Sequence, residues 1–167
     1  MAVTEVFHGV SGILRPFREY ITGLNLSPGD QIVYYGCVGT CTPFVELLAI
    51  AIRGNKADQI FVPLLDETKA KKIGYVEDVG MQVCGGAVSV KPKVIVVMGG
   101  LAMPMMPLSK DDVKAMISRH DNVKVVGVCF MSMFKKAGWL HTIPFDCLID
   151  AQLNPVEVTK QDPVNPS

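Results

Sequence analysis

The feature that most constrains the fold is a series of short runs that are apolar almost throughout. The clearest of them are residues 31–35 (QIVYY), 60–64 (IFVPL), 93–98 (KVIVVM) and 123–130 (VKVVGVCF). A strand with one face in water alternates apolar and polar residues, whereas these runs do not. Strands of this kind are buried on both faces, as in a parallel sheet that is covered by helices on both sides.

Segments with helical spacing or helix-start signals lie between these runs. Residues 9–23 place apolar and charged positions at helical spacing and predict an opening helix. Thr42 and Pro43 predict a helix start after the first strand, because Thr can cap and Pro at the first helical position gives up an N–H that would be unpaired. Residues 109–112 (SKDD) resemble a capping box and predict another helix start.

The alternation of strands and helices predicts an α/β fold. We expect a three-layer, doubly wound, Rossmann-like, mostly parallel sheet of five or six strands with helices on both faces. Residues 146–153 predict the last strand, and Tyr75–Val79 can form an edge strand in an otherwise ambiguous segment. We expect a single domain over residues 1–154, followed by a loosely ordered, Pro-rich tail over residues 155–167.

Six strands suit the order 3-2-1-4-5-6, in which the first and fourth strands are neighbours and ligands lodge outside their carboxyl ends. The loops that follow Tyr35 and Met98 would then face each other. Exposed N–H groups and the dipole of the following helix suit a phosphate or a carboxylate there. We therefore expect a small anionic ligand or a phosphorylated coenzyme, bound by Gly36, Cys37, Val38, Gly39, Thr40, Cys41, Thr42, Gly99 and Gly100.

Spacing excludes two common nucleotide-binding motifs. The dinucleotide fingerprint needs G-x-G-x-x-G, whereas residues 36–41 read GCVGTC, and no acidic residue ends the following strand. A P-loop needs G-K-[ST], which this loop does not contain. Ser132 follows a strand but lacks the glycines of a G-x-S-x-G elbow. The sequence therefore assigns no cofactor and no catalytic residue, and it leaves open whether the protein is an enzyme.

Cys37 and Cys41 offer an alternative function in thiol-redox or metal chemistry. The chain has five cysteines, an odd number that argues against a disulfide scaffold and for reduced thiols. The helix start should lower the pKa of Cys41 by favouring its thiolate. Zinc and iron–sulfur sites need about four ligands, usually in close pairs, and the other cysteines are single. We therefore predict no metal site, with Cys37 and Cys41 as the alternative ligands.

The methionine-rich loop at residues 99–108 is apolar where most loops are polar. Thioether surfaces adapt to irregular partners, so a third alternative is a non-enzymatic subunit that uses this loop as its contact. Glu46 lies in a helix that is too apolar for a freely exposed face, which indicates that another subunit covers the helix. We therefore expect a homo-oligomer, a dimer.

Charge and hydropathy exclude several classes of partner. Lys plus Arg and Asp plus Glu number 16 each, so the chain carries no excess of positive charge for a nucleic acid. No apolar run approaches the roughly 20 residues that span a bilayer. The first residues include Glu5 and no basic segment, unlike a secretion signal. We expect a cytoplasmic protein that binds neither nucleic acid nor membrane.

Three segments of the chain carry a family resemblance: residues 37–44 (CVGTCTPF), 96–104 (VVMGGLAMP) and 126–139 (VGVCFMSMFKKAGW). With these segments the chain resembles an uncharacterised family of small α/β proteins from methanogenic archaea, over roughly residues 25–158. The resemblance implies an archaeal, cytoplasmic α/β protein. It carries over no catalytic residues, and it makes a redox or coenzyme-related role more plausible because such cells are anaerobic.

Overall fold

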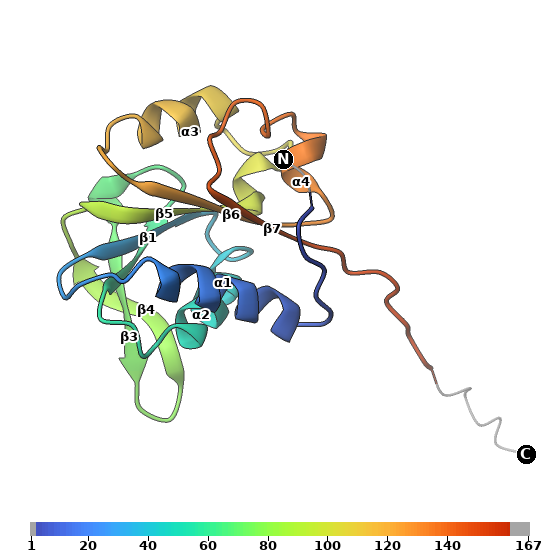
Figure 1. Cartoon of the computed structure of the whole chain (residues 1–167), viewed down its shortest axis with the longest axis horizontal. Helices are drawn as coiled ribbons and strands as arrows, with labels where there is room; N and C mark the ends of the chain where they lie inside the picture. The colour runs from blue at the N-terminus through green and yellow to red at the C-terminus, as the bar shows by residue number, and fades with distance from the viewer. Residues whose placement is uncertain (1–2, 161–167) are drawn as a thin grey trace, which may run out of the picture.

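The computed structural model describes residues 3–160, which fold around a seven-stranded sheet in the order β4-β3-β2-β1-β5-β6-β7 (Figure 1). Five of the strands are parallel: β1 (Gln31–Gly36), β2 (Asp58–Pro63), β5 (Pro92–Met98), β6 (Lys124–Phe130) and β7 (Cys147–Ala151). The expected α/β fold with a mostly parallel sheet is therefore confirmed. No helix within residues 3–160 is long and apolar enough to cross a membrane.

An antiparallel hairpin extends the sheet beyond β2 and changes the strand count from the expected five or six. Its strands are β3 (Lys71–Val76) and β4 (Gly80–Ala87). Of the expected edge strand at Tyr75–Val79, only Tyr75 and Val76 lie in a strand, because the chain turns after Val76 and reverses direction. Apolar runs in the sequence do not reveal the hairpin, because β3 is largely exposed and begins with two lysines.

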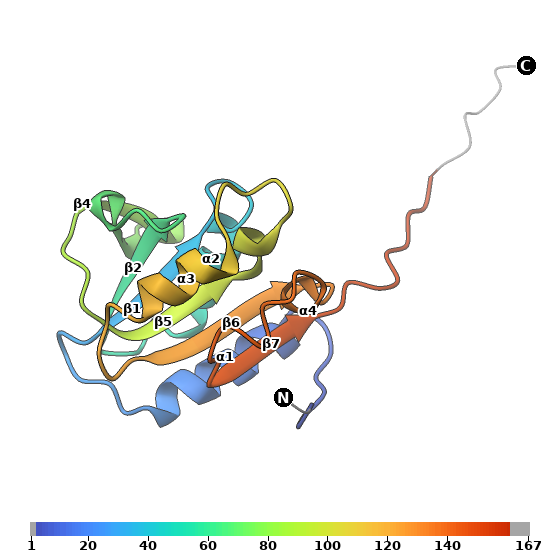
Figure 2. The same cartoon turned by 90° about the horizontal axis from the view of Figure 1, so that it is seen from above.

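Helices pack on the two faces of the sheet (Figure 2). The helices α1 (Ser11–Gly23) and α2 (Thr42–Ala51) contact one face, whereas η2 (Gly99–Ala102), α3 (Lys110–Ile117) and α4 (Met133–Lys136) contact the other. A short 3₁₀ turn, η1 (Glu67–Lys69), connects β2 to the hairpin. The expected opening helix and the capping box of α3 at Ser109 and Asp112 are confirmed.

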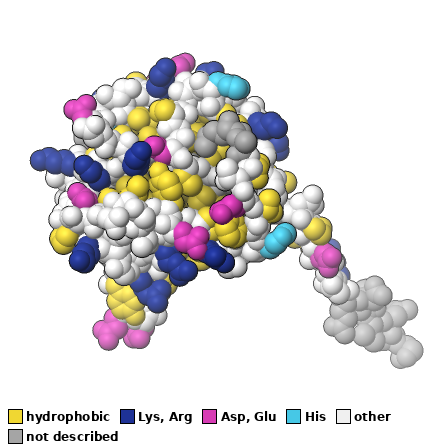
Figure 3. All heavy atoms as spheres, viewed as in Figure 1, with side chains coloured by type: hydrophobic (Ala, Val, Ile, Leu, Met, Phe, Trp, Pro, Cys, Tyr) yellow, Lys and Arg dark blue, Asp and Glu magenta, His cyan; other side chains and the backbone are white. Residues whose placement is uncertain are grey.

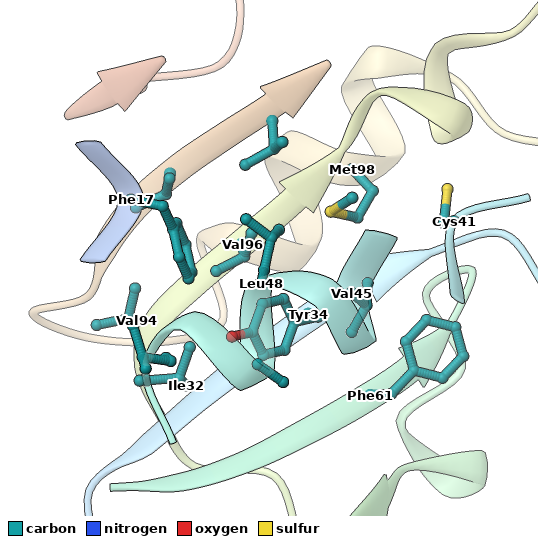
Figure 4. Close-up of a cluster of buried hydrophobic side chains, with 14 of the residues drawn as sticks. Phe17, Ile32, Tyr34, Cys41, Val45, Leu48, Phe61, Val94, Val96 and Met98 are labelled. Atoms are coloured by element: carbon teal, nitrogen blue, oxygen red, sulfur yellow. The ribbon is translucent and has the colours of Figure 1, made fainter. Parts of the chain in front are cut away.

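The central strands supply alternate side chains to two cores. In β1, Ile32 and Tyr34 face α1 and α2, while Val33 and Tyr35 face α3, and all four are fully buried. Both faces of each central strand are thus apolar, which explains the runs seen in the sequence. Figure 4 shows the first core, where Phe17 of α1 lies near Tyr34 and Val94.

One buried polar network lies inside the first core. The Tyr34 hydroxyl donates a hydrogen bond to Gln59 Oε1 at 2.8 Å, and Gln59 Nε2 donates to the Ala49 carbonyl at 3.2 Å. Gln59 is only 5% exposed, so these bonds replace water that the amide has lost. The network ties β1, β2 and the end of α2 together.

The β3–β4 hairpin covers α2, and this corrects the interpretation of Glu46. The backbone N–H of Val83 in β4 donates to Glu46 Oε1 at 3.0 Å, and Met81 and Val83 pack against the core beside α2. The apolar character of this helix is therefore explained within the chain, without another subunit. Glu46 serves to hold the hairpin against α2.

The tail expected at residues 155–167 lies partly outside the described residues. Residues 155–160 have no regular secondary structure and are exposed. Residues 161–167 are not among those described.

Replacing Tyr34 with Phe should destabilise the protein by about 1–3 kcal/mol, because Gln59 Oε1 would be left buried without a donor. Urea unfolding of the wild type and of Tyr34→Phe measures this difference. Tyr75→Phe is the matched control, since Tyr75 is 70% exposed. Equal stability of wild type and Tyr34→Phe would contradict the role given to this bond.

Candidate functional site

The candidate site is the turn that joins β1 to α2 at the carboxyl edge of the sheet. The Cys41 N–H donates to the Cys37 carbonyl at 3.2 Å, and Gly39 takes a positive φ of 86° within the turn. The helix begins at Thr42 as expected, with Pro43 in its first turn. The expected Thr42 cap is wrong, because Cys41 occupies the N-cap position and no side chain caps this helix.

The turn brings Cys37 and Cys41 together as free thiols. Their Sγ atoms lie 3.0 Å apart, in hydrogen-bonding contact. The Thr40 hydroxyl lies 3.0 Å from Cys37 Sγ. Both cysteines are only 4% exposed, and they belong to the core that packs against α1 and α2. The structure thus joins two of the predicted site residues into one buried dithiol.

Gly36 and Gly100 leave the space that the dithiol fills. A Cβ atom at Gly100 would collide with both sulfur atoms, and would lie 2.5 Å from Cys37 Sγ. A Cβ atom at Gly36 would lie 2.8 Å from Cys41 Cβ and 3.2 Å from Met98 Cγ. Real Cβ atoms do not approach other atoms this closely, so only glycine fits at either position without a shift.

Gly99 makes a similar contact on the opposite face of the sheet. A Cβ atom there would collide with Cys129, lying 2.8 Å from its Cα. Cys129 is 1% exposed and belongs to the core beside α3 and α4. The pair Gly99–Gly100 therefore separates the Cys37–Cys41 dithiol from a third buried thiol.

The electrostatic surroundings of Cys41 differ from those expected at a helix start. Burial raises the pKa of Cys41 to about 12, and the neighbouring Cys37 thiol adds to the rise. The backbone N–H groups of Cys37 and Gly100 lower the pKa of Cys41, by less than burial raises it. The expected lowering of this pKa is therefore wrong, because the cost of burying a thiolate exceeds the help from nearby N–H groups. Cys41 is a neutral thiol at neutral pH.

The outer part of the turn faces solvent. Val38, Gly39 and Thr40 are exposed, and Thr42 is half-buried. Within residues 3–160 the N–H groups of Val38, Gly39 and Thr40 donate to no other group. These three N–H groups are the part of the predicted anion site that the structure leaves accessible.

The expected facing loop beyond Met98 is a 3₁₀ helix rather than an open wall. Leu101 and Ala102 of η2 are buried, and Gly100 packs on the sulfur atoms. Two surface hollows among the described residues lie away from this turn. One is bordered by Leu65 and α3, and the other by the segment before β1 and the end of α2. The switch point therefore contains packed sulfur atoms where an open crevice was expected.

A second cluster of polar side chains was missed in the sequence. Glu67 Oε1 accepts hydrogen bonds from the Tyr35 hydroxyl at 3.0 Å and from Arg119 Nη2 at 3.2 Å, and His120 Nε2 lies 3.1 Å away. Burial and the Glu67 carboxylate raise the pKa of Tyr35. No sequence spacing could have found this cluster, since its members come from β1, η1 and the turn that follows α3. It holds these three elements together.

The methionine-rich loop is divided between core and surface. Met103 and Met106 pack against the core that contains the dithiol, whereas Met105 is 80% exposed. Within residues 3–160 no three side chains of His, Cys, Asp or Glu converge as ligands for a metal ion.

Substitution of Gly100 by Ala should destabilise the protein by about 1–3 kcal/mol, because the new methyl group overlaps both sulfur atoms. Gly86→Ala is the control, since a Cβ atom at Gly86 meets nothing within 4 Å. In the variant Cys37→Ala/Cys41→Ala, which lacks both thiols, Gly100→Ala should lower the free energy of unfolding by less than it does in the wild type. Urea unfolding of the wild type, Gly100→Ala, Cys37→Ala/Cys41→Ala and the triple variant tests this, with Gly86→Ala measured alongside as the control. Equal destabilisation by Gly100→Ala in both backgrounds would contradict the contact.

The sequences of known proteins place the chain in a family. Residues 8–154 match a family described as an uncharacterized protein conserved in archaea, DUF2124. The chain is 41% identical over 143 residues to an uncharacterized protein of Methanocaldococcus jannaschii, covering 86% of this chain and 85% of that protein. An uncharacterized protein of Methanothermobacter thermautotrophicus is 34% identical over 157 residues, covering 92% of this chain and 96% of that protein.

A solved structure shares the fold. The crystal structure of a protein of unknown function from Methanothermobacter thermautotrophicus superimposes with a TM-score of 0.84 at 32% sequence identity, covering 96% of this chain and 99% of that one. The resemblance to an uncharacterised family of methanogenic archaea is thereby confirmed. The chain belongs to the archaeal family DUF2124.

Proposed function

We propose that Cys37 and Cys41 form a redox dithiol that exchanges with disulfides. The observation that carries the proposal is the 3.0 Å separation of the two Sγ atoms inside a closed turn. A disulfide needs about 2.05 Å between sulfur atoms, so the two thiols need to move only about 1 Å closer. Gly36 and Gly100 give the sulfur atoms a fitted space, which supports a role for the pair rather than for either thiol alone.

The reaction follows the ordinary course of thiol–disulfide exchange. One of the two cysteines loses its proton and attacks a sulfur of a substrate disulfide, which releases one substrate thiolate and forms a mixed disulfide. The second cysteine then attacks its neighbour in the mixed disulfide and releases the other substrate thiolate. The dithiol gives up two electrons and two protons, and the substrate disulfide becomes two thiols.

Burial gives the pair a low resting reactivity. Both thiols are 4% exposed, and the raised pKa of Cys41 keeps that thiol protonated at neutral pH. The exposed residues 38–40 form the outer wall of the pair, so displacement of this short turn would expose the sulfur atoms. We propose that docking of the disulfide partner provides this displacement. A reducing cytoplasm would keep the unoccupied protein in the dithiol form.

A small anionic ligand or a phosphorylated coenzyme remains a second candidate at the same turn. The accessible N–H groups of Val38, Gly39 and Thr40 support it, as does the position of the turn beside η2. The strands follow one another outward in opposite directions from the neighbouring strands β1 and β5, which supports a doubly wound, Rossmann-like interpretation. In such a fold ligands lie at the carboxyl ends of these two strands. The packed sulfur atoms leave such a ligand only the outer surface of the turn.

Apolar side chains at the surface support a protein contact. Val38, Phe44, Met105 and Met131 are exposed, and the Phe44 ring lies 4.5 Å from the Phe130 ring. Hydrophobic side chains also reach the surface between charged ones in the space-filling view (Figure 3). A second copy of the chain or a larger complex could use this surface, which keeps the expected homo-oligomer as a proposal.

Oxidation of the purified protein should form a disulfide between Cys37 and Cys41 and lower the mass by about 2 Da. Incubation with mixtures of oxidised and reduced glutathione, followed by alkylation and peptide mass spectrometry, measures the fraction oxidised. Cys37→Ser and Cys41→Ser should each abolish the intramolecular bond. Cys84→Ser is the matched control, because Cys84 is the exposed cysteine.

Two results would overturn the redox proposal. One is a dithiol that stays reduced under every glutathione mixture while the protein remains folded by circular dichroism. The other is oxidation that joins Cys84 to another molecule and leaves Cys37 and Cys41 alkylated as free thiols.

If the second candidate is correct, phosphate, nucleotides or phosphorylated coenzymes should raise the melting temperature of the wild type. At a ligand concentration of about 100 times Kd the stabilisation is about 2.7 kcal/mol. Val38→Pro and Thr40→Pro remove one N–H each and should weaken the effect, whereas Gly39 has a positive φ that proline cannot adopt. A panel of such ligands that leaves the melting temperature unchanged contradicts this candidate without affecting the redox proposal.

A further inference from the structure

The two thiols of the turn have different neighbours, although each cysteine is only 4% exposed. Cys37 Sγ lies 3.0 Å from the Thr40 hydroxyl oxygen and 3.0 Å from Cys41 Sγ. Thr40 is exposed, so a side chain at the surface contacts the Cys37 sulfur directly. Within residues 3–160, Cys37 is the one side chain in hydrogen-bonding contact with Cys41 Sγ. Thr40, Cys37 and Cys41 therefore form a chain of contacts that begins at the surface.

Ionisation of Cys37 would fix the direction of both of its hydrogen bonds. A thiolate can only accept, so the Thr40 hydroxyl and the Cys41 thiol would both donate to it. Hydrogen bonds to a charged group are stronger than those between neutral groups, and they favour the charged form. A Cys41 thiolate would have one side-chain donor, the Cys37 thiol, among the described residues. The side-chain contacts thus favour a thiolate at Cys37.

Cys41 is suited to stay protonated while Cys37 ionises. Burial raises the pKa of Cys41 to about 12, so its S–H group is available as a donor at neutral pH. Its sulfur also lies 3.0 Å from Cys37 Sγ, which is the atom that it would attack in a mixed disulfide on Cys37. Position and protonation therefore suit Cys41 for the second step of the exchange.

We propose that Cys37 is the thiol that attacks the substrate disulfide, that the Thr40 hydroxyl donates a hydrogen bond to its thiolate, and that Cys41 closes the intramolecular disulfide. This inference rests on the exchange function proposed above and assigns its two steps to particular atoms. Thr40 acts through Cys37 and is therefore a positioning residue.

The two steps balance in atoms and electrons. Cys37 gives its proton to solvent, and its sulfur bonds to one substrate sulfur while the substrate S–S bond breaks and the other substrate sulfur leaves as a thiolate. Cys41 then gives its proton to solvent and attacks Cys37 Sγ. This forms the bond between Cys37 and Cys41 and releases the second substrate thiolate, so the dithiol has passed two electrons to the substrate.

Alkylation of the reduced, full-length wild type with a limiting amount of iodoacetamide tests the assignment without any substitution. Fragmentation of the peptide that contains both cysteines locates the label. Cys37 should carry about ten times more label than Cys41 at neutral pH, because the thiolate is the reacting form. The exposed Cys84 shows that the reagent is active. Preferential labelling of Cys41 would overturn the assignment.

Trapping of the mixed disulfide gives a second measurement. In a Cys84→Ser background, Cys41→Ser should accumulate glutathione on Cys37 when it is incubated with oxidised glutathione. Cys37→Ser should accumulate it on Cys41 about tenfold more slowly. Circular dichroism identifies any variant that has lost its fold. Faster accumulation on Cys41 in a folded Cys37→Ser variant would contradict the proposed order.

The role of Thr40 is tested by the pH profile of Cys37 alkylation. Thr40→Val removes the donor and should raise the midpoint of this profile by about one pH unit, whereas Thr40→Ser keeps the hydroxyl and should react as the wild type does. Thr22→Val is the matched control, because Thr22 is exposed at the end of α1. A Thr40→Val profile with the midpoint of the wild type, even if alkylation is faster at every pH, would overturn the role of Thr40.

These tests separate the inference from the redox function. A protein that forms the disulfide between Cys37 and Cys41 but is alkylated first at Cys41 contradicts the order of attack and leaves the redox function intact. A folded protein that is alkylated first at Cys37 but never forms the disulfide contradicts the redox function, and with it the role of Cys37 as the attacking thiol.

Discussion

The contact between the Gly100 backbone and two sulfur atoms is the interaction on which the carboxyl edge of the sheet depends. It brings the end of β5 against the turn after β1, at the point where the strand order changes direction. A side chain at Gly100 would occupy the volume of the thiols, and a side chain at Gly36 would press on Cys41 and Met98. The turn after β1, the helix η2 and the strands β1 and β5 thus pack together around the sulfur atoms of Cys37 and Cys41.

Much of the fold could be predicted, because a strand that is buried on both faces appears in the sequence as a run of apolar residues. The strands β1, β5 and β6 contribute buried side chains to both cores, and each appears as an apolar run. The hairpin could not be predicted in this way. Its strands lie at the edge of the sheet, where one face meets solvent, and its cover of α2 depends on the Val83 N–H and the Glu46 carboxylate, 37 positions apart.

The candidate site could be located from the sequence, but its chemistry could not. The segment after the first strand contains two glycines and two cysteines and leads into a helix start. This pattern predicts that Cys37 and Cys41 lie at the edge of the sheet. The direction of the Cys41 pKa shift required a knowledge of burial, because the helix start and the loss of water act in opposite senses. The Glu67 cluster depends on tertiary contacts between Tyr35, η1 and the turn that follows α3, for which the sequence contains no pattern.

The adjacent glycines at 99 and 100 contact thiols on opposite faces of the sheet. One peptide unit therefore lies between the close approach to Cys37 and Cys41 and the close approach to Cys129. Cys129 lies at the end of β6, directly before the turn in which Met131 and Ser132 hold left-handed backbone conformations at the start of α4. The two glycines thus let β5 end between two buried thiol groups, one on each face of the sheet, where any larger residue would displace one of them.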